Sequence, residues 1–375
     1  MHLRTLPRRF LLAALAVLLL AAGFCLAGVF WVRRSSPPHG PYLQSVTTDS
    51  IWIVWDTRQP SIGRLEYGLT SAMGKLALEQ QTSTHHELQL TGLEPYTRYF
   101  YQVDRHKVSS FLTAASPEQT RFRFAVYGDT REGYTVHRAI VNQIVKLAPD
   151  FVLNTGDLVE SGDCLSCWDD FFRAEASLLR STPFYPTLGN HEDDQSPFGQ
   201  TLYFDIFHLP GVERWYSFDY GNARFISLKA DGYPVEVYFP DSEQIAWLEQ
   251  QLQTNGKPWT FVFFHIGVYT SRNEDFLELG MRQRLAPLFE RYGVEAVFMG
   301  HNHGYERVEV NGITYITAAG GGAPLYNASV PEPGSQSIAR TFHFVLLEMA
   351  GDRLLGTTID NHGKTIDQFQ LTPTH

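Results

Sequence analysis

Five short apolar runs of this chain each end close to a polar side chain that can bind a metal ion. The runs occupy residues 124–127, 151–153, 185–188, 261–264 and 296–299. The polar residues that follow them, in order, are Asp129, Asp157, Asn190, His265, His301 and His303. In open α/β sheets, sites form just beyond the carboxyl ends of the strands. We therefore expect the runs to be strands whose polar ends meet in one place.

Helical periodicity appears between these runs. Val136, Ile140, Ile144 and Leu147 recur at spacings of four, four and three residues, which predicts an amphipathic helix. Further helices are expected over residues 168–179, 242–252 and 281–292, the second of them capped by Ser242. Strands alternating with helices favour a layered α/β domain over residues 118–375, with its sheets flanked by helices.

The N-terminus contains one long uncharged segment. Residues 10–32 carry no charged side chain, and arginines lie on both sides of them. The length suffices to cross a hydrocarbon core of roughly 30 Å as a helix. We expect residues 1–34 to be a cytoplasmic stub and transmembrane anchor that places the rest of the chain on the extracytoplasmic face. The alternative is a cleaved signal peptide, which would make the protein secreted.

Residues 35–117 show the alternation of short β-strands. Apolar side chains alternate in residues 51–55, 86–90 and 99–103, which predicts a small all-β sandwich. Residues 93–99 resemble the turn-and-tyrosine signature of fibronectin type III domains. No cluster of Asp, Glu or His in residues 41–115 suggests a site, so we expect a supporting module with His85, His86 and His106 at its surface.

The polar residues after the five runs define a particular metal chemistry. Two carboxylates, one amide and three imidazoles suit zinc, manganese or iron, whereas calcium prefers oxygen ligands alone. Six donors exceed the needs of one tetrahedral ion and suit two ions that share a carboxylate, a pair able to clamp phosphorus during in-line displacement. The formal net charge of −10 gives no basic footprint for nucleic acid, so we expect no specific nucleic-acid binding.

The three cysteines fall into two groups. Cys25 lies in the uncharged segment and is expected to be a buried membrane thiol, whereas Cys164 and Cys167 are separated by two residues in a loop. Outside the cytoplasm the pair is expected to form a local disulfide. A redox role is the alternative, although no thioredoxin-like context surrounds the pair.

The motifs resemble those of the calcineurin-like metallophosphoesterase superfamily. They are Gly128-Asp129, Gly156-Asp157, Gly189-Asn190-His191-Glu192, Val262-Phe263-Phe264-His265 and Gly300-His301-Asn302-His303. Residues 300–307, the glycines at 320–322 and the preceding fibronectin-like segment resemble the purple acid phosphatase branch in particular. The resemblance implies a two-metal hydrolase of phosphoesters that uses a hydroxide bridging two divalent or trivalent ions of iron, zinc or manganese.

The resemblance also implies a role for each residue. Asp157 would bridge the ions, Asp129 and His303 would bind the first ion, and the second would be bound by Asn190, His265 and His301. His191 would lie beside the leaving oxygen as general acid or electrostatic stabiliser.

Two positions depart from the family pattern. Arg131 stands where many members carry a histidine, and its guanidinium is expected to bind the substrate phosphate. Glu160 stands where purple acid phosphatases carry the tyrosine responsible for their colour, so the colour should be absent. Either Glu160 or His137 could complete the first metal site. A red iron enzyme despite Glu160 is a further interpretation, which a visible spectrum would decide.

The substrate stays open at this stage. A phosphorylated small molecule and a macromolecular phosphoester both fit, as do monoesters and diesters. An alternative outside the class of enzymes is a non-catalytic surface adhesion or scaffold protein that carries an idle phosphoesterase domain.

Overall fold

The computed structural model describes residues 38–104, 106–192, 199–230, 242–272, 276–328 and 330–373. Residues 39–375 form one compact unit that contains both the N-terminal sheet and the α/β part. The expected membrane segment at residues 10–32 lies outside the described residues, as does Cys25. Among the helices that are described, none has the length and apolar character needed to span a membrane.

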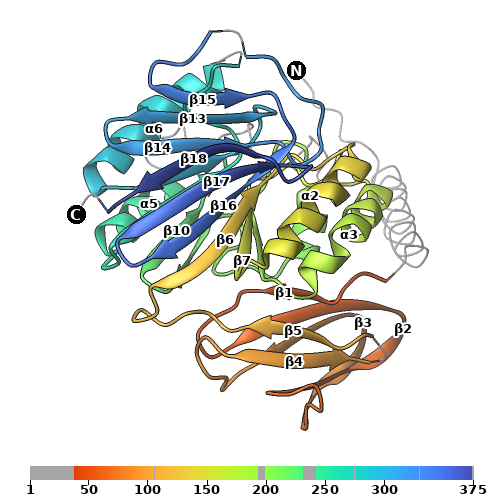
Figure 1. The fold of residues 1–375 in the computed structure, drawn as a ribbon. Coiled ribbons are helices and arrows are strands. Elements are labelled where there is room, and N and C mark those ends of the chain that lie inside the picture. The colour runs from red at the N-terminus through yellow and green to blue at the C-terminus, as the bar shows by residue number, and fades with distance from the viewer. Residues whose placement is uncertain are drawn as a thin grey trace, which may run out of the picture. The chain divides into compact units, whose positions relative to one another are not determined.

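The N-terminal part is an antiparallel sheet (Figure 1). Its strands are β1 (Tyr42–Gln44), β2 (Ile51–Gly68), β3 (Lys75–Leu90), β4 (Arg98–Val103) and β5 (Ser109–Leu112). They pair in the order β1-β2-β4-β5, with β3 also paired to β2. The strand expected at residues 51–55 is longer than its alternation indicated, because β2 continues to Gly68 through register shifts between Asp56 and Arg64.

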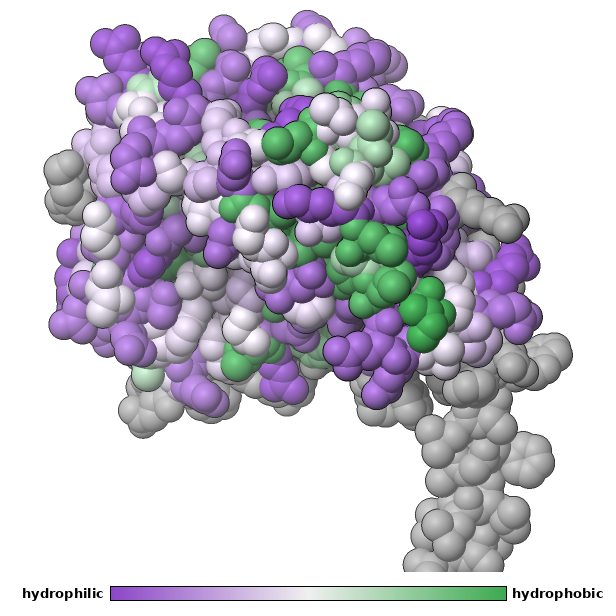
Figure 2. Space-filling view, turned by 90° about the horizontal axis from the view of Figure 1, so that it is seen from below, coloured by the Kyte–Doolittle hydropathy of each residue, from purple (hydrophilic) through white to green (hydrophobic). Residues whose placement is uncertain are grey.

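Exposed hydrophobic side chains gather on this sheet. Figure 2 views the molecule from the side on which the N-terminal sheet lies in Figure 1 and shows such side chains in patches. Ile62, Leu76 and Leu78 on β2 and β3 are each more than two fifths exposed. One of the three histidines expected at the surface is buried: His86 is inaccessible to solvent, stacks on Trp55 and lies 2.6 Å from the Glu79 carboxylate. His86 is therefore a core residue.

The α/β part contains a six-stranded sheet in the order β18-β17-β16-β6-β7-β8. Its parallel strands are β6 (Arg121–Tyr127), β7 (Phe151–Asn154) and β8 (Phe184–Pro186). The antiparallel extension consists of β16 (His343–Ala350), β17 (Arg353–Asp360) and β18 (Thr365–Leu371). The sequence runs expected at 124–127, 151–153 and 185–188 thus lie in or beside adjacent parallel strands.

A seven-stranded sheet follows the order β15-β13-β14-β12-β11-β10-β9. Its parallel strands are β10 (Ala223–Ser227), β11 (Trp259–Phe264), β12 (Ala296–Met299) and β14 (Ile313–Ala318). The antiparallel strands are β9 (Tyr216–Tyr220), β13 (Tyr305–Val310) and β15 (Ser335–Ala339). The two remaining expected runs, 261–264 and 296–299, are neighbours in this sheet.

Helices cover the two sheets, as the layered α/β prediction requires. Figure 1 shows α2 (Tyr134–Leu147) and α3 (Leu165–Leu179) beside β6 and β7, with α5 (Glu243–Gln253) and α6 (Phe276–Tyr292) beside the other sheet. A shorter helix, α4, spans Gly199–Ile206. Aromatic rings join the sheets, because Phe124 of β6 packs against Phe225, Phe261 and Phe298. This interior fixes the two sets of strand ends relative to each other.

Candidate metal centre

The strand ends of both sheets deliver polar residues to one region. Asp129 and Asp157 follow β6 and β7, whereas His301 and His303 follow β12 in the other sheet. Asp129, Asp157 and His301 have left-handed backbone conformations, with φ of 57°, 54° and 66°. For residues other than glycine this conformation costs roughly 1–2 kcal/mol. Strain of this kind is concentrated at functional sites, where the surrounding structure maintains it.

All six expected ligands lie together. The Asn190 Oδ1 atom is 3.0 Å from His265 Nε2 and 3.0 Å from His301 Nδ1. His265 Nε2 is also 3.2 Å from Asp157 Oδ1, and the His301 backbone N–H donates to the Asp129 carboxylate. Each of these contacts joins segments far apart in the sequence, so the predicted convergence of the strand ends is present in the fold.

The second part of the site centres on Asp129. His303 Nε2 lies 3.3 Å from Asp129 Oδ1. One ligand atom each from Asp129, Asp157 and His303 all lie within 4.8 Å of one another, and all three residues are buried. A single ion can be reached by three donors at this separation. Asp157 therefore contacts both halves of the cluster, which is where a shared carboxylate belongs.

The imidazole rings are oriented by backbone carbonyls. His265 Nδ1–H donates to the Thr155 carbonyl at 2.8 Å, and His303 Nδ1–H donates to the Pro324 carbonyl at 2.7 Å. These bonds fix the tautomer and leave each Nε2 lone pair facing the carboxylates. Histidines that bind metals typically donate their other ring N–H in this way. The donor set and its orientation thus fit a pair of transition-metal ions.

Buried charge shifts the pKa values within the cluster. Burial lowers the pKa of His301 to about 4, and the neighbouring His265 acts in the same direction. Burial opposes ionisation of Asp157, but His265 and His191 outweigh it and hold the Asp157 pKa below its ordinary value. A neutral imidazole and an ionised carboxylate are the forms that bind metal ions.

Glu192 is a supporting residue that the sequence analysis did not single out. Its fully buried carboxylate accepts hydrogen bonds from the backbone N–H groups of Asp157, Leu158, Val159 and Gly189. Burial, together with the charge of Asp157, raises the pKa of Glu192 to about 8. The carboxylate ties the loop after β7 to the loop after β8. Its place in the run Gly189-Asn190-His191-Glu192 was the only signal available.

His191 and Arg131 border the cluster. The His191 Nδ1–H donates to the Glu160 carbonyl at 2.6 Å, and its Nε2 lies 3.8 Å from Asp157 Oδ2. Arg131 Nε is 3.4 Å from the same Asp157 oxygen, and its Nη1 donates to the Glu160 carboxylate at 2.9 Å. Both side chains are therefore within reach of a group bound over Asp157.

The two residues considered for completing the first metal site have other partners. The Glu160 carboxylate is 45% exposed and pairs with Arg131. The buried His137 ring contacts the Glu175 carboxylate at 2.5 Å, and Glu175 also accepts from the Tyr127 hydroxyl. Among the described residues, neither belongs to the group formed by Asp129, Asp157 and His303.

Comparisons with known proteins identify the kind of domain that carries this site. Residues 122–305 match the family described as calcineurin-like phosphoesterase. A Mycobacterium tuberculosis protein described as uncharacterized is 30% identical over 225 residues, which cover 54% of this chain and 42% of that protein. Purple acid phosphatase 21 of Arabidopsis thaliana is 29% identical over 259 residues, which cover 63% of this chain and 58% of the plant protein.

A solved structure shows the same fold. The purple acid phosphatase PPD1 from yellow lupin (Lupinus luteus) seeds superposes with a TM-score of 0.79 at 21% identity, covering 90% of this chain and 74% of the lupin chain. The chain spans only about half the length of the curated relatives, 42% of the mycobacterial protein and 58% of the Arabidopsis protein. The expected relationship to purple acid phosphatases is confirmed at the level of the α/β domain.

Proposed function

Because residues 122–305 form a calcineurin-like phosphoesterase domain, we propose that the protein hydrolyses phosphoric esters with two bound metal ions. The observation that carries this proposal is the cluster itself. Ligand atoms of Asp129, Asp157 and His303 lie within 4.8 Å of one another, and the Asn190 amide oxygen lies 3.0 Å from ring nitrogens of His265 and His301. Burying this many polar and charged groups together costs free energy of folding unless partners such as metal ions compensate for their lost hydration.

Each residue has a proposed role. Asp129 and His303 would hold the first ion, Asn190, His265 and His301 the second, and Asp157 both. Ions bound there, of iron, zinc or manganese, would supply the positive charge that activates water and neutralises phosphate oxygens. The remaining roles belong to side chains at the border of the cluster.

Arg131 and His191 would act on the substrate directly. The Arg131 guanidinium, whose charge is secured by Asp157 and Glu160, presents a planar fork that matches phosphate oxygens. The Glu160 carbonyl holds the His191 ring with Nε2 toward the site, where it can carry a proton to the leaving oxygen. Substrates on this proposal are small or macromolecular phosphoesters.

The experiment that tests this function combines metal analysis with turnover. Purified protein should contain about two equivalents of transition metal and hydrolyse aryl phosphates. Asp157→Asn and Asn190→Ala should each lower kcat by about a hundredfold or more, since each removes charge stabilisation in the transition state. Asp352→Asn, at an exposed turn before β17, is the matched control. Metal content without turnover of any phosphoester would favour the scaffold alternative.

The proposal includes the N-terminal region. Residues 10–32 would anchor the chain in a membrane with the α/β domain on the extracytoplasmic face, because they contain no charged side chain and arginines flank them. Residues 35–117 would act as a fibronectin-like supporting module and residues 118–375 as the catalytic domain. Membrane fractionation with N-terminal sequencing tests the anchor: a mature chain that begins near residue 35 would show a cleaved signal instead.

A further inference from the structure

The loop between β7 and α3 holds His191 at two points. Besides the bond from the His191 ring to the Glu160 carbonyl, the Gly162 N–H donates to the His191 carbonyl at 2.8 Å. Gly162 is buried, and a Cβ atom at this position would lie 2.3 Å from the Glu192 carbonyl oxygen. The loop therefore fixes both the ring and the backbone of His191, and it does so at close range.

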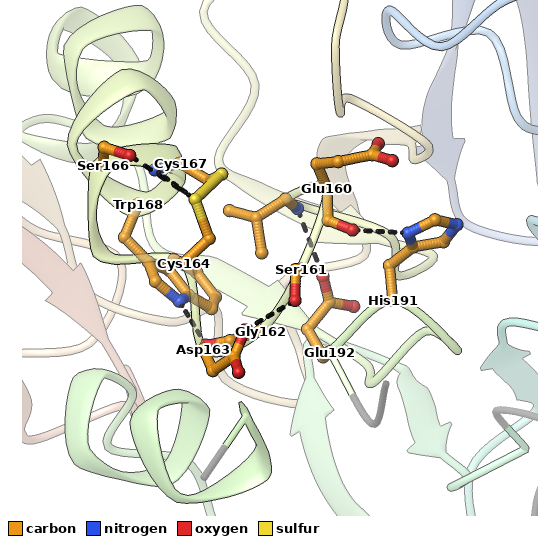
Figure 3. Close-up of a disulfide and its surroundings, with 11 residues drawn as sticks. Glu160, Ser161, Gly162, Asp163, Cys164, Ser166, Cys167, Trp168, His191 and Glu192 are labelled. Atoms are coloured by element: carbon orange, nitrogen blue, oxygen red, sulfur yellow. Dashed lines mark hydrogen bonds between the residues drawn. A yellow bond between two sulfur atoms is a disulfide. The ribbon is translucent and has the colours of Figure 1, made fainter. Parts of the chain in front are cut away.

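A disulfide closes the far end of this loop. Cys164 and Cys167 are joined, as the sequence analysis expected for a protein outside the cytoplasm. Cys164 is the N-cap of α3, and its sulfur accepts from the Cys167 N–H. Figure 3 shows the next residue, Trp168, bonded through its indole N–H to the Gly162 carbonyl, a distance of 2.9 Å. The cross-link is thus connected to His191 through Trp168 and Gly162.

A cavity of about 130 Å³ borders part of this loop. Its lining includes Val159, Glu160 and Cys167, together with Arg131 and His137. A wall that faces empty space lacks the contacts that immobilise side chains in a close-packed interior. The covalent bond between Cys164 and Cys167 therefore adds restraint where Cys167 borders this cavity.

We propose that the Cys164–Cys167 disulfide is a positioning device for His191, acting through Trp168 and Gly162 on the loop that orients the imidazole. This inference rests on the proposed phosphoesterase function. In the described part of the chain the disulfide makes no contact with the candidate metal ligands, so its removal should lower kcat and leave metal content unchanged. His191 itself is the residue through which the effect passes.

The test is the double variant Cys164→Ser/Cys167→Ala. Serine is a preferred N-cap, so the helix keeps its cap and only the cross-link is lost. Because positioned proton transfer is worth about 10²–10⁴-fold, we expect partial misplacement to lower kcat by about five- to tenfold. KM should change less than twofold. Ser166→Ala, at an exposed position in the first turn of α3, is the matched control and should retain full activity.

A double-mutant cycle separates positioning from general damage. In the His191→Ala background, removing the disulfide should change kcat less than twofold, because the group it positions is gone. Equal losses in both backgrounds would overturn the proposal, as would unchanged kcat in the double cysteine variant. Trp168→Phe offers a second route that leaves the cysteines intact: it removes the indole N–H and should lower kcat in the same direction.

Hydrogen exchange of the metal-free protein gives a readout independent of activity. The Gly162 amide should exchange about tenfold faster in the double cysteine variant, since local opening is no longer restrained. The amides of α5, in the other layer, should exchange at their original rate. Absence of turnover by the unaltered protein would refute the proposed function, and unchanged exchange at Gly162 would refute the restraint itself.

Discussion

The buried Glu192 carboxylate holds together the two loops that carry Asp157 and Asn190, which are candidate metal ligands. Glu192→Gln would turn an amide NH₂ toward backbone N–H groups that now donate to a carboxylate. An unsatisfied buried donor costs about 1–3 kcal/mol, so we expect the free energy of unfolding to fall by that amount. Loss of a supporting partner also lowers metal affinity by about 10–100-fold.

Urea unfolding and metal titration measure the two effects of Glu192→Gln. Glu348→Gln, on the exposed face of β16, serves as control for the same chemical change. If Glu192→Gln binds metal as tightly as the unaltered protein, the carboxylate does not position the ligand loops.

Arg131 allows a test of phosphate recognition. Arg131→Lys keeps the positive charge but loses the planar fork beside Asp157. Because a hydrogen bond to a charged group contributes about 1.5–3 kcal/mol, the inhibition constant of inorganic phosphate should rise about tenfold or more. Competitive inhibition assays measure this constant. An unchanged value would mean that Arg131 serves Glu160 and Asp157 rather than substrate.

The clustering of the candidate ligand residues was predictable because each follows an apolar run. Asp129, Asp157 and His265 come within three residues of the ends of strands, and the α/β rule brings such positions together. No sequence rule identifies Glu192 and Thr155 as supporting residues. The Glu192 carboxylate accepts from backbone N–H groups of neighbouring loops, and Thr155 accepts through its own backbone carbonyl. Partners that use backbone atoms leave no residue-type signature, which is why sequence reasoning missed them.

At the scale of elements, the disulfide at the start of α3 also stabilises the fold. It closes a short loop, with a sequence separation of 3. The chain-entropy relation gives about 2 kcal/mol for a loop this short. Cys164→Ser/Cys167→Ala should therefore lower the free energy of unfolding by about 2 kcal/mol, measured in urea. A loss several times larger would indicate that α3 itself unfolds without the cross-link.

Local periodicity predicted elements better than it predicted their partners. The helix α2 was expected from its apolar spacing, and Ile140 and Ile144 are fully buried as that spacing requires. The pairing of β6 with β16 was not expected, because its register joins Phe124 to Leu347 across more than half of the chain. Such pairing depends on tertiary packing, for which a local pattern gives no evidence.

At the scale of the whole molecule, a series of contacts between histidines and carboxylates connects the N-terminal sheet to the α/β part. His39 Nε2 lies 2.7 Å from Asp169 of α3, and His39 Nδ1 lies 3.3 Å from Asp56 of β2. Asp56 in turn contacts His85 of β3 at 2.8 Å. The sequence analysis placed His85 at the surface, yet it is part of this connection.

This series of histidine–carboxylate contacts continues to the segment after α4. His85 Nε2 lies 3.5 Å from Glu87, and the other Glu87 oxygen lies 3.5 Å from His208. The His208 ring also packs on Trp52 of β2, with ring centroids 3.8 Å apart. The N-terminal sheet is therefore attached at two places by pairs of ionisable side chains.

The pKa shifts of His85 and Glu87 in this series of contacts predict how the free energy of unfolding depends on pH. Burial alone would lower the pKa of His85, but hydrogen bonds to Asp56 and Glu87 outweigh it and raise the pKa from 6.5 to about 9. Hydrogen bonds from His208 and His85 lower the pKa of Glu87 from 4.5 to about 2. The His85 contribution is complete below pH 6.5 and is lost as the pH rises to about 9. The Glu87 contribution is complete above pH 4.5 and is lost as the pH falls to about 2.

The free energy of unfolding should accordingly be highest between about pH 4.5 and 6.5 and decline above that range. His85→Gln removes the titrating group, so the decline between pH 6.5 and 9 should become shallower in urea unfolding followed at several pH values. His362→Gln, at an exposed turn, should leave the slope unchanged. The His39 pKa is also raised, because Asp56 and Asp169 outweigh the effect of its burial, so part of the slope should persist in His85→Gln. An identical slope in His85→Gln would place the titration elsewhere and leave the N-terminal sheet held by its apolar contacts.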